Sequence, residues 1–455
     1  MLKDWIEVEL GDVCFTTSGG TPSRSKSEYY KGTIPWVKSG ELNYGLILDT
    51  EEHISDEAIT NSSAKIFPEG TLLIALYGAT IGKLSILGVP ATTNQAICGI
   101  YKNELFETKF LFNYLFHKRQ KLIEQGTGGA QPNISQAILK KLSLPLAPLP
   151  EQRAITAKIE QLFSELDNGI ANLKAAKSKL EIYRQAILKQ AFEGELTKEW
   201  REKQTKNHGN HVNQKNHSTD SLPETWKWVK LENLAVVGTG ATPKRGESNY
   251  WQNGSIAWIT SGALNDLYVK EASEFITEAA IKETNCKIFP KGSLLIAMYG
   301  EGKTRGKCSE LMISAATNQA IASIEINDEF KEYKKYVKWF LLKNYDDIRM
   351  LSSGGVQPNL NLTIVKNTKL PLCPIEEQNQ IVQEIETRLS VCDKLNESID
   401  QSLEKAQALR QSILKKAFEG KLLSQDELQN CRQQPDWEPA AKLLERVKKD
   451  SKTKR

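Results

Sequence analysis

The sequence has few features of secreted or membrane proteins. Its 455 residues include seven cysteines, which form no Cys-x-x-Cys pair. An odd, scattered set of cysteines is typical of reduced thiols packed in a core, so no disulfide framework is expected. The opening MLKDWIEVEL lacks the apolar stretch of a signal peptide, and runs such as LLIALYG are too short to cross a bilayer. These absences predict a soluble, cytoplasmic protein without a membrane segment.

The chain also has little net charge. Sixty Lys and Arg residues face 56 Asp and Glu residues, which leaves a formal net charge of +4. This mild excess is compatible with nucleic-acid binding, but steering depends on where charges cluster, so net charge alone does not identify a partner. The length is sufficient for about two to four domains, each with its own core.

Motifs of several enzyme classes are missing. There is no His-Glu-x-x-His, no Gly-x-Ser-x-Gly, no acidic nuclease cluster and no Asn/Asp-Pro-Pro-aromatic motif of a base methyltransferase. The segment GEGKTRGK at 300–307 resembles a phosphate-binding loop, which needs Gly, four residues and then Gly-Lys-Ser/Thr. However, Ala297 stands where the first glycine should be, and Cys308 follows the second Gly-Lys pair. We therefore predict that the chain is not an enzyme.

What the sequence does have is an internal repeat along nearly its whole length. KIFPEGTLLIALYG at 65–78 recurs as KIFPKGSLLIAMYG at 287–300, with 11 of 14 positions identical. GGAQPN, which contains Gln131, recurs as GGVQPN, which contains Gln357. Trp-x-x-Val-x-Leu, Thr-Pro, Thr-Asn-Gln-Ala and Ala-Phe-x-Gly also occur in both copies, and the offset between copies drifts by only a few positions. Such self-similarity predicts a duplicated structural unit.

Each copy is expected to contain a globular head followed by a long helix. Short apolar runs between Gly, Pro and Asn turns predict an α/β (α+β) head. The Pro-rich LPLAPLP then suits a helix start, because proline is tolerated in the first turn. The expected segments are head 1 at 1–149, helical spacer 1 at 150–196, a polar linker at 197–222, head 2 at 223–375, helical spacer 2 at 376–424 and a C-terminal tail at 425–455.

The helical spacers carry a heptad pattern that predicts a coiled coil. The heptad positions of the first spacer are Ile159, Leu166, Leu173, Leu180 and Ile187, with Ile155, Leu162, Ala176 and Tyr183 on the complementary seam. Those of the second are Ile385, Cys392, Ile399, Ala406 and Ile413, flanked by Ile381, Leu395 and Leu409. The simplest partner for each helix is the other one. We therefore expect a pseudo-two-fold chain whose heads are separated by an antiparallel helix pair. The alternative is that each helix lies along its own head.

Three histidines in the polar linker, His208, His211 and His217, could suggest a metal site. No cysteine or carboxylate framework accompanies them, whereas structural metal sites draw on such ligands. A flexible, solvated linker is the preferred interpretation, and no metal is expected.

Polar and basic side chains near the repeated motifs are candidates for contact with nucleic acid. Arg and Lys reach phosphates or guanine edges, and Asn and Gln can pair with adenine. The candidates are Arg24, Lys26, Lys38, Thr80, Lys83, Asn94 and Gln95 in the first copy, and Lys244, Arg245, Lys303, Arg305, Lys307, Asn318 and Gln319 in the second. A structural role competes for the polar residues that both copies share. Residues that read different sequences should instead differ between the heads.

In this order and in duplicate, the motifs resemble those of the specificity subunit of type I restriction–modification systems. The resemblance covers about residues 1–424 and departs mildly at the second helix start, where Pro-Ile-Glu-Glu-Gln replaces Pro-Leu-Pro-Glu-Gln. It implies a non-catalytic subunit that binds double-stranded DNA. Each head would be a target-recognition domain that reads one half of a bipartite target in the major groove, while the helix pair fixes the gap.

The resemblance also implies partners. They are two methyltransferase subunits, which carry S-adenosylmethionine, and restriction/translocase subunits, which use ATP and magnesium; no cofactor is expected in this chain. Because the heads are similar but not identical, the target should be asymmetric. The repeated Gln-Pro-Asn would mark the same turn in each head, near the join to the helices.

Two other classes of function remain open on the residues alone. A coiled-coil scaffold with protein-binding heads would show no salt-dependent affinity for DNA, whereas phosphate neutralisation gives a steep fall with salt. A fused methyltransferase or nuclease would bind its cofactor without a partner.

Overall fold

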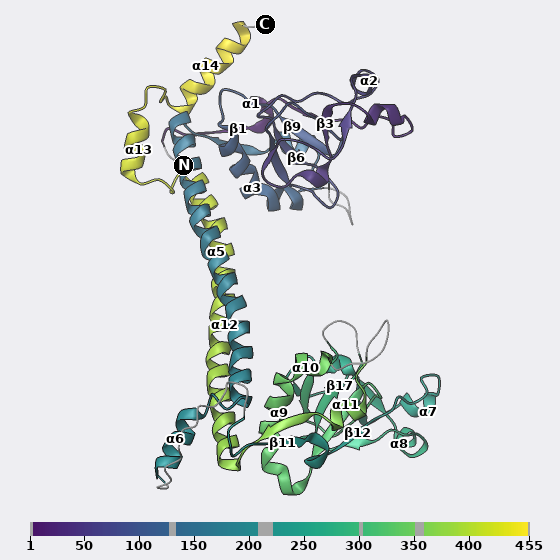
Figure 1. Cartoon of the computed structure of the whole chain (residues 1–455). Helices are drawn as coiled ribbons and strands as arrows, with labels where there is room; N and C mark the ends of the chain where they lie inside the picture. Colours follow the sequence, from purple (N-terminus) through teal and green to yellow (C-terminus); the bar gives the residue numbers. More distant parts are fainter. Residues whose placement is uncertain (1–2, 127–132, 208–221, 300–303, 351–358, 454–455) are drawn as a thin grey trace. The chain divides into compact units, whose positions relative to one another are not determined.

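The protein divides into two compact units, each containing one head (Figure 1). The computed structural model describes residues 3–126, 133–207, 222–299, 304–350 and 359–453. Unit 1 consists of Met1–Lys174 and Asp400–Arg455, and unit 2 consists of Ala175–Ile399. Unit 1 is therefore assembled from both ends of the chain, whereas unit 2 is continuous.

Head 1 contains three small sheets and a set of short helices around one longer one. Its strands are β1 (Ile6–Glu9), β2 (Thr16–Ser18), β3 (Ile34–Val37), β4 (Leu46–Ile47), β5 (His53–Ile54), β6 (Leu72–Ala75), β7 (Leu84–Leu87), β8 (Thr92–Thr93), β9 (Ile97–Ile100) and β10 (Ser143–Leu146). Its helices are α1 (Leu10–Val13), η1 (Ser27–Tyr30), η2 (Ser39–Glu41), α2 (Asp56–Thr60), α3 (Thr108–Glu124) and α4 (Gln136–Lys140). The sheet orders are β2-β9-β6-β7-β4, β5-β3-β8 and β1-β10.

Head 2 repeats this arrangement. Its strands are β11 (Lys227–Lys230), β12 (Ala235–Thr239), β13 (Ile256–Ile259), β14 (Tyr268–Val269), β15 (Glu274–Ile276), β16 (Ile288–Phe289), β17 (Leu294–Ala297), β18 (Cys308–Leu311), β19 (Ala315–Thr317), β20 (Ile321–Ile326) and β21 (Lys369–Leu372). Its helices are η3 (Leu231–Asn233), α7 (Ser248–Trp251), η4 (Ser261–Ala263), α8 (Glu278–Glu283), η5 (Asp328–Tyr333), α9 (Lys334–Lys343), α10 (Tyr345–Met350) and α11 (Leu362–Lys366). The sheet orders, β12-β20-β17-β18-β14, β15-β13-β19-β16 and β11-β21, match those of head 1 strand for strand, with β16 added.

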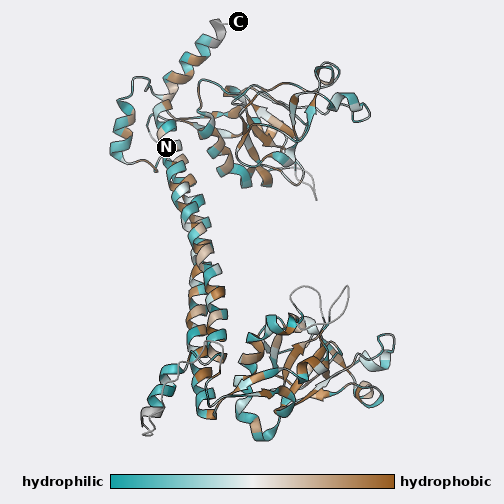
Figure 2. Ribbon diagram, in the orientation of Figure 1, coloured by the Kyte–Doolittle hydropathy of each residue, from teal (hydrophilic) through white to brown (hydrophobic). Residues whose placement is uncertain are grey.

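The repeated Leu-Leu-Ile-Ala forms the central strand of each five-stranded sheet. In β6, Leu72 and Ile74 pack on one face into the core that contains α3, while Leu73 and Ala75 pack on the other into the core beneath the β5-β3-β8 sheet. All four residues are buried, because the strand is covered on both faces. This explains why the run is continuously apolar instead of alternating. Figure 2 shows the hydrophobic colour concentrated in these strands.

Two helices of 44 residues each follow the heads, α5 (Leu149–Phe192) and α12 (Ile375–Phe418). In unit 1 the start of α5 packs against the end of α12, with Ile155 and Ile159 in one core with Ile413. In unit 2 the end of α5 packs against the start of α12. Within each unit the helices therefore run antiparallel, which confirms the predicted pairing. None of the helices within the described ranges is long and apolar enough to span a membrane.

Two ion pairs show that the helices meet by the same contacts in both units. Arg184 pairs with Asp393 in unit 2, and Arg410 pairs with Asp167 in unit 1. Arg184 and Arg410 occupy equivalent positions in the two copies, and so do Asp167 and Asp393. Each ion pair therefore joins the same two repeat positions, with the arginine taken from one copy and the aspartate from the other.

The heptad positions are at least half-buried throughout, but the complementary seam is not. Tyr183 is 49% exposed, and Leu395 and Leu409 are each 50% exposed. These three side chains are therefore only half-covered. Each long helix packs against one partner helix, which buries only one apolar stripe of its surface. The second seam is buried only where a head packs against it, as at Ile155 and Ile381.

The aromatic residue of each Ala-Phe-x-Gly motif docks into the head of the opposite copy. Phe418, at the end of α12, contacts Phe110 and Tyr114 of α3 with ring centroids 5.3 and 4.9 Å apart. Phe192, at the end of α5, contacts Tyr336 and Phe340 of α9 at 5.1 and 5.3 Å. Each head core is thus completed by the helix that began in the other copy.

Segments after the long helices extend this packing. Helix α6 (Lys198–Asn207) lies within the expected polar linker, and the linker histidines fall outside the described residues. In unit 1, α13 (Gln425–Arg432) and α14 (Ala440–Thr453) follow α12, and Ala440 and Leu443 are buried in the head 1 core. The C-terminal tail is therefore part of unit 1.

Phe418→Ala and Phe192→Ala should each loosen one head. Because both rings are buried, each change should cost about 3 kcal/mol of stability. Hydrogen–deuterium exchange should rise in α3 for the first variant and in α9 for the second. Leu409→Ala, at a half-exposed position of α12, is the control and should cost about 0.5 kcal/mol. Equal effects of both variants on both heads would contradict the assignment.

The stability of unit 1 should depend on His117. Burial lowers the pKa of this imidazole from 6.5 to about 4, helped by the neighbouring Lys118 and Lys415 and opposed by Glu419. Its ring lies 5.7 Å from that of Phe418. Below its unfolded pKa the unfolded chain binds a proton that the folded chain does not, so stability should fall as pH drops from 6.5 towards 4. In His117→Leu, the thermal-unfolding midpoint should depend less on pH between about pH 7 and pH 5. An unchanged pH dependence would show that another group is responsible.

Candidate nucleic-acid interface

The Thr-Asn-Gln-Ala segment connects the two main sheets of each head. In head 1 the Asn94 amide donates to Val37 O at 2.9 Å, which extends the pairing of β8 with β3. Two residues later, Ala96 O accepts from the Leu76 amide at 2.8 Å, at the end of β6. Asn318–Ala320 makes the same two contacts in head 2. The segment thus lies between the small sheet and the loop that follows the central strand.

The exposed glutamine of this segment is held by the threonine of the Thr-Pro motif. The Thr21 hydroxyl donates to Gln95 Oε1 in head 1, and the Thr242 hydroxyl donates to Gln319 Oε1 at 2.6 Å in head 2. With its oxygen bonded inside the protein, each amide retains an NH₂ group that can donate outward. Both predicted glutamines are exposed.

The predicted arginine of each head is bound to a glutamate and stacked on aromatic rings. In head 1, Arg24 Nη1 and Nη2 donate to Glu52 at 2.6 and 3.3 Å, and the guanidinium lies 4.2 Å from the Tyr30 ring and 4.9 Å from the Trp36 ring. The bond to Glu52 raises the pKa of Arg24, and the bond to Arg24 lowers the pKa of Glu52. Because two of its N–H donors are bonded to Glu52, the guanidinium helps to hold the loop that carries Arg24.

Head 2 repeats this cluster with different rings. Arg245 makes two hydrogen bonds to Glu274, and its guanidinium lies 4.1 Å from the Trp251 ring and 4.9 Å from the Trp258 ring. Both arginine side chains are 53% exposed, so their outer N–H groups still face solvent. The contacts within each head give both arginines a structural role.

The remaining basic candidates near this loop differ between the heads. Lys38 donates to Glu51 at 2.8 Å and to Glu52 at 3.1 Å, whereas Thr260 occupies the matching position in head 2. Lys26 donates to the Tyr29 hydroxyl at 2.8 Å. Lys244 is exposed. These side chains are the variable part of a shared framework.

Other candidates lie in the loop after the central strand. In head 1 this loop contains Thr80 and Lys83, and Lys83 makes no ion pair with any described residue. In head 2, Arg305 and Lys307 lie in the matching loop, and Lys307 Nζ donates to Asn265 Oδ1 at 2.7 Å. Lys303 falls outside the described residues.

The residue that follows each Gln-Pro-Asn motif is bound just before the same loop. Gln131 and Gln357 are outside the described residues, but the Ile134 amide, just after the motif, donates to Leu76 O at 2.8 Å. Leu360 makes the equivalent bond to Met298 O at 3.1 Å. The described flank of each motif is therefore bound to the end of the central strand.

Other shared residues form the join between head and helix. Trp5 Nε1 donates to Glu151 Oε2 at 2.7 Å, and Trp226 Nε1 donates to Glu377 Oε2 at 2.9 Å. Both carboxylates are buried at the start of a long helix. The Trp-x-x-Val-x-Leu and Glu-Gln motifs thus meet at this join.

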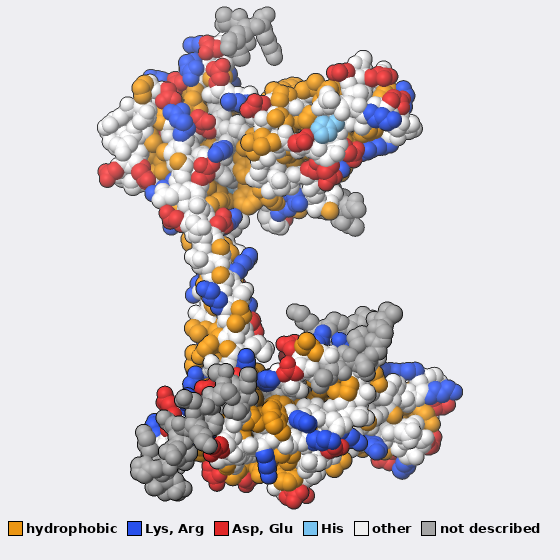
Figure 3. All heavy atoms as spheres, viewed as in Figure 1, with side chains coloured by type: hydrophobic (Ala, Val, Ile, Leu, Met, Phe, Trp, Pro, Cys, Tyr) orange, Lys and Arg blue, Asp and Glu red, His pale blue; other side chains and the backbone are white. Residues whose placement is uncertain are grey.

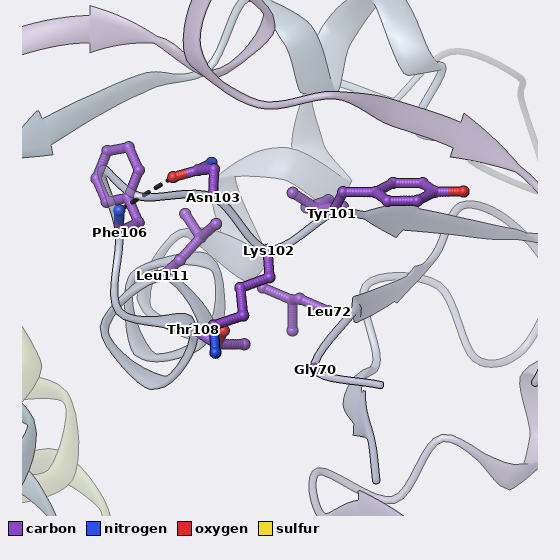
Figure 4. A pocket seen from close by; sticks show the side chains of 9 residues that line it. Gly70, Leu72, Tyr101, Lys102, Asn103, Phe106, Thr108 and Leu111 are labelled. Carbon is purple, nitrogen blue, oxygen red and sulfur yellow. Dashed lines mark hydrogen bonds between the residues drawn. The ribbon is translucent and has the colours of Figure 1, made fainter. Parts of the chain in front are cut away.

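The surface of each head carries charged side chains of both signs. On the face seen in Figure 3, Lys and Arg side chains alternate with acidic ones over each head. The cavity of head 1 shown in Figure 4, between Leu72, Tyr101, Asn103 and Leu111, holds about 10 Å³, room for one water. Among the described residues, no cluster of His, Cys, Asp and Glu could hold a metal ion.

Sequence reasoning missed the partners of the candidates. Glu52 and Glu274 stand at nearly the same offset as Arg24 and Arg245, so the repeat itself marks them. Arg119 and Arg349, which bind the loop after the central strand, lie further apart than the repeated motifs do and escape a search at the offset of the repeat.

The duplicated heads and helices coincide with a known family. The family model described as the type I restriction modification DNA specificity domain matches residues 2–175 and 223–405. The chain belongs to this family. It is therefore a specificity subunit, the non-catalytic component that recognises the DNA target, as the resemblance predicted.

Individual relatives support the same assignment over most of the chain. This specificity subunit is 25% identical over 471 residues to the type I restriction enzyme EcoDI specificity subunit of Escherichia coli, covering 98% of this chain and 95% of the relative. It is 27% identical over 380 residues to the MjaIX specificity subunit of Methanocaldococcus jannaschii, covering 82% and 84%.

Solved structures share the fold. A chain from a study of complex assembly and conformational transition in the type I R-M system aligns with a TM-score of 0.70 at 19% identity, covering 93% of this chain and 99% of that chain. The HsdS subunit from Thermoanaerobacter tengcongensis aligns with a TM-score of 0.60 at 19% identity, covering 93% and 98%. Two recognition heads with helical connections are thus the fold of this specificity subunit.

Glu52→Gln should loosen the Thr-Pro loop of head 1, and Glu274→Gln that of head 2. Each change removes the charge that holds the arginine, at a cost of about 1 kcal/mol because the pair is partly exposed. Hydrogen–deuterium exchange should rise in residues 20–30 or 241–252 respectively. Glu51→Gln neutralises an adjacent, more exposed carboxylate and is the matched control. If it loosens the loop of head 1 equally, the Arg24 cluster does not hold it.

Proposed function

We propose that the two heads read different halves of one bipartite, asymmetric DNA target and that the helix pair sets the gap between them. The observation that carries this proposal is a shared framework with different side chains at matching loop positions. The two five-stranded sheets have the same strand order, yet Ile81 corresponds to Arg305 and Lys38 to Thr260. Identical heads would select a palindrome, whereas these heads present different groups.

The proposed contact residues fall into two groups, the glutamines and the basic residues, according to their surroundings in each head. Gln95 and Gln319, whose oxygens are held by threonine, are suited to donate to base acceptors. Lys83, Arg305 and the other basic candidates are suited to phosphates or guanine. The full proposed set is Arg24, Lys26, Lys38, Thr80, Lys83, Asn94, Gln95, Lys244, Arg245, Lys303, Arg305, Lys307, Asn318 and Gln319.

We assign residues 1–149 and 223–375 as the target-recognition domains and 150–196 and 376–424 as spacers. The proposed partners are two methyltransferase subunits that carry S-adenosylmethionine and restriction/translocase subunits that use ATP and magnesium. Cellular DNA as the target implies that the protein acts in the cytoplasm.

Methylation-site mapping on genomic DNA, with the chain co-expressed with its methyltransferase partner, tests this function. The expected result is a split motif with two defined, non-identical ends and an unspecified middle. A perfect palindrome would contradict the asymmetry. If no split motif appears, DNA binding by the complex at low and high salt decides: a steep loss with salt retains DNA as the ligand, and no affinity at either salt excludes it.

Removing one heptad from each helix, 170–176 from α5 and 396–402 from α12, should shorten the gap. A whole heptad preserves the seam and accounts for about 10 Å of helix, which is about three base pairs. The two half-motifs should stay the same while the unspecified middle shrinks. An unchanged gap would show that the helix length does not set it. Exchanging Leu409 for Ala, which leaves the length intact, is the control.

A further inference from the structure

An arginine on a helix of each head binds the loop after the central strand. In head 1, Arg119 of α3 donates from Nη2 to Ile81 O at 3.1 Å. In head 2, Arg349 of α10 donates from Nη1 to Arg305 O at 2.7 Å. Ile81 and Arg305 occupy equivalent positions, each followed by the Gly-Lys of the loop. The same carbonyl is therefore bound by an arginine in both heads.

A glycine makes room for each arginine. Gly82 and Gly306 are buried, and their φ angles of +72° and +87° lie in the left-handed region. A Cβ at Gly82 would lie 2.9 Å from Arg119 Cγ, and one at Gly306 would lie 3.0 Å from Arg349 Cγ. Both the backbone conformation and the close approach thus require glycine. The glycine and the arginine form one arrangement, present twice.

The described end of the loop is closed by the same backbone bonds in each head. The Gly82 amide donates to Ala75 O at 2.8 Å, and the Lys83 amide donates to Thr80 O at 2.9 Å. In head 2, the Gly306 amide donates to Ala297 O at 2.8 Å and the Lys307 amide to Thr304 O at 3.1 Å. The arginine adds a side-chain bond from the helix layer to these backbone bonds. It fixes the residue that follows Thr80 or Thr304.

The two arginines reach this carbonyl from different helical positions. Arg119 is 38 residues from Ile81 on the continuous helix α3, whereas Arg349 is 44 residues from Arg305 and lies on α10, beyond the break after α9. The contact is retained although the spacing is not. Because the contact is kept although the sequence separation of arginine and loop differs, we attribute it to a need to hold the loop in place.

We infer that Arg119 and Arg349 are positioning residues for DNA recognition, each holding the loop of its own head in the conformation that meets one half of the target. This inference rests on the proposed function. A loop that is ordered before binding loses little conformational entropy when the complex forms. Less of the free energy of its contacts is therefore spent on ordering the loop, and the affinity is higher. Arg119 makes no ion pair among the described residues, so its charge also favours phosphate near the loop of head 1.

The test is methylation mapping and rate measurement with the complete methyltransferase complex. Arg119→Ala should lower the methylation rate at full sites about tenfold and relax base preference in one half-motif only. Arg349→Ala should do the same in the other half-motif. Arg119→Lys, which still offers one donor to Ile81 O, should restore the motif. Lys121→Ala, an exposed cation on the same helix, is the matched control and should leave motif and rate unchanged.

Gly82→Ala provides an independent variant if Arg119→Ala does not yield soluble protein. It displaces the loop while leaving the arginine in place, and it should relax the same half-motif as Arg119→Ala. A retained motif in Gly82→Ala or Arg119→Ala, or relaxation spread equally over both halves, would overturn the inference. If the wild-type complex gives no split motif, the proposed function fails and the inference falls with it; a normal wild-type map with unaffected variants overturns the inference alone.

Discussion

The insertion of Phe192 and Phe418 into opposite heads is the interaction on which the rest of the structure depends. Each ring lies at the end of a 44-residue helix and completes a core that contains the helix layer of a head. Without these rings, α3 and α9 would lose an apolar neighbour, and the ends of α5 and α12 would lose their contact with a head. The contact therefore joins helix pairing to head folding in a single cooperative core.

The join at the other end of each helix follows a different principle. Glu151 and Glu377 are buried side chains at helix starts, and each accepts a hydrogen bond from the tryptophan of its own head. The second oxygen is bonded differently in the two units: by Trp437 of the tail in unit 1, and by Thr197 and Arg201 near α6 in unit 2. A shared carboxylate thus accepts whichever segment follows the partner helix. The tryptophan–glutamate hydrogen bond orients the helix start relative to the head, while apolar packing stabilises the junction.

Much of the architecture could be predicted because the repeat is a physical record of equivalent environments. Leu-Leu-Ile-Ala, the Glu-Gln motif and Ala-Phe-x-Gly are shared because each fills the same place in two cores. Heptad spacing shows that a stripe of the helix is apolar, but it does not show which neighbour covers that stripe. Tyr183 and Leu395 on the second seam are accordingly half-exposed. The partners of Arg24 and Arg245 lie on another part of each head, and the Arg119 and Arg349 contacts arise at unequal spacing. The repeat marks Glu52 and Glu274 as shared residues, but it does not say that they contact the arginines. At the unequal spacing of Arg119 and Arg349 it gives no signal, and only the tertiary fold brings these groups together.

The discontinuous composition of unit 1 has a consequence for biosynthesis. Its first segment, Met1–Lys174, leaves the ribosome early, but its core also needs Ile413, Phe418 and parts of the tail. The intervening unit 2, Ala175–Ile399, is continuous, so its head can complete its core while head 1 still waits. At about 5–20 residues per second, synthesis of unit 2 separates the two parts of unit 1 by roughly 10–45 s. During that interval the site for Phe418 is open to water, and the nascent chain exposes an aromatic surface that chaperones are suited to cover.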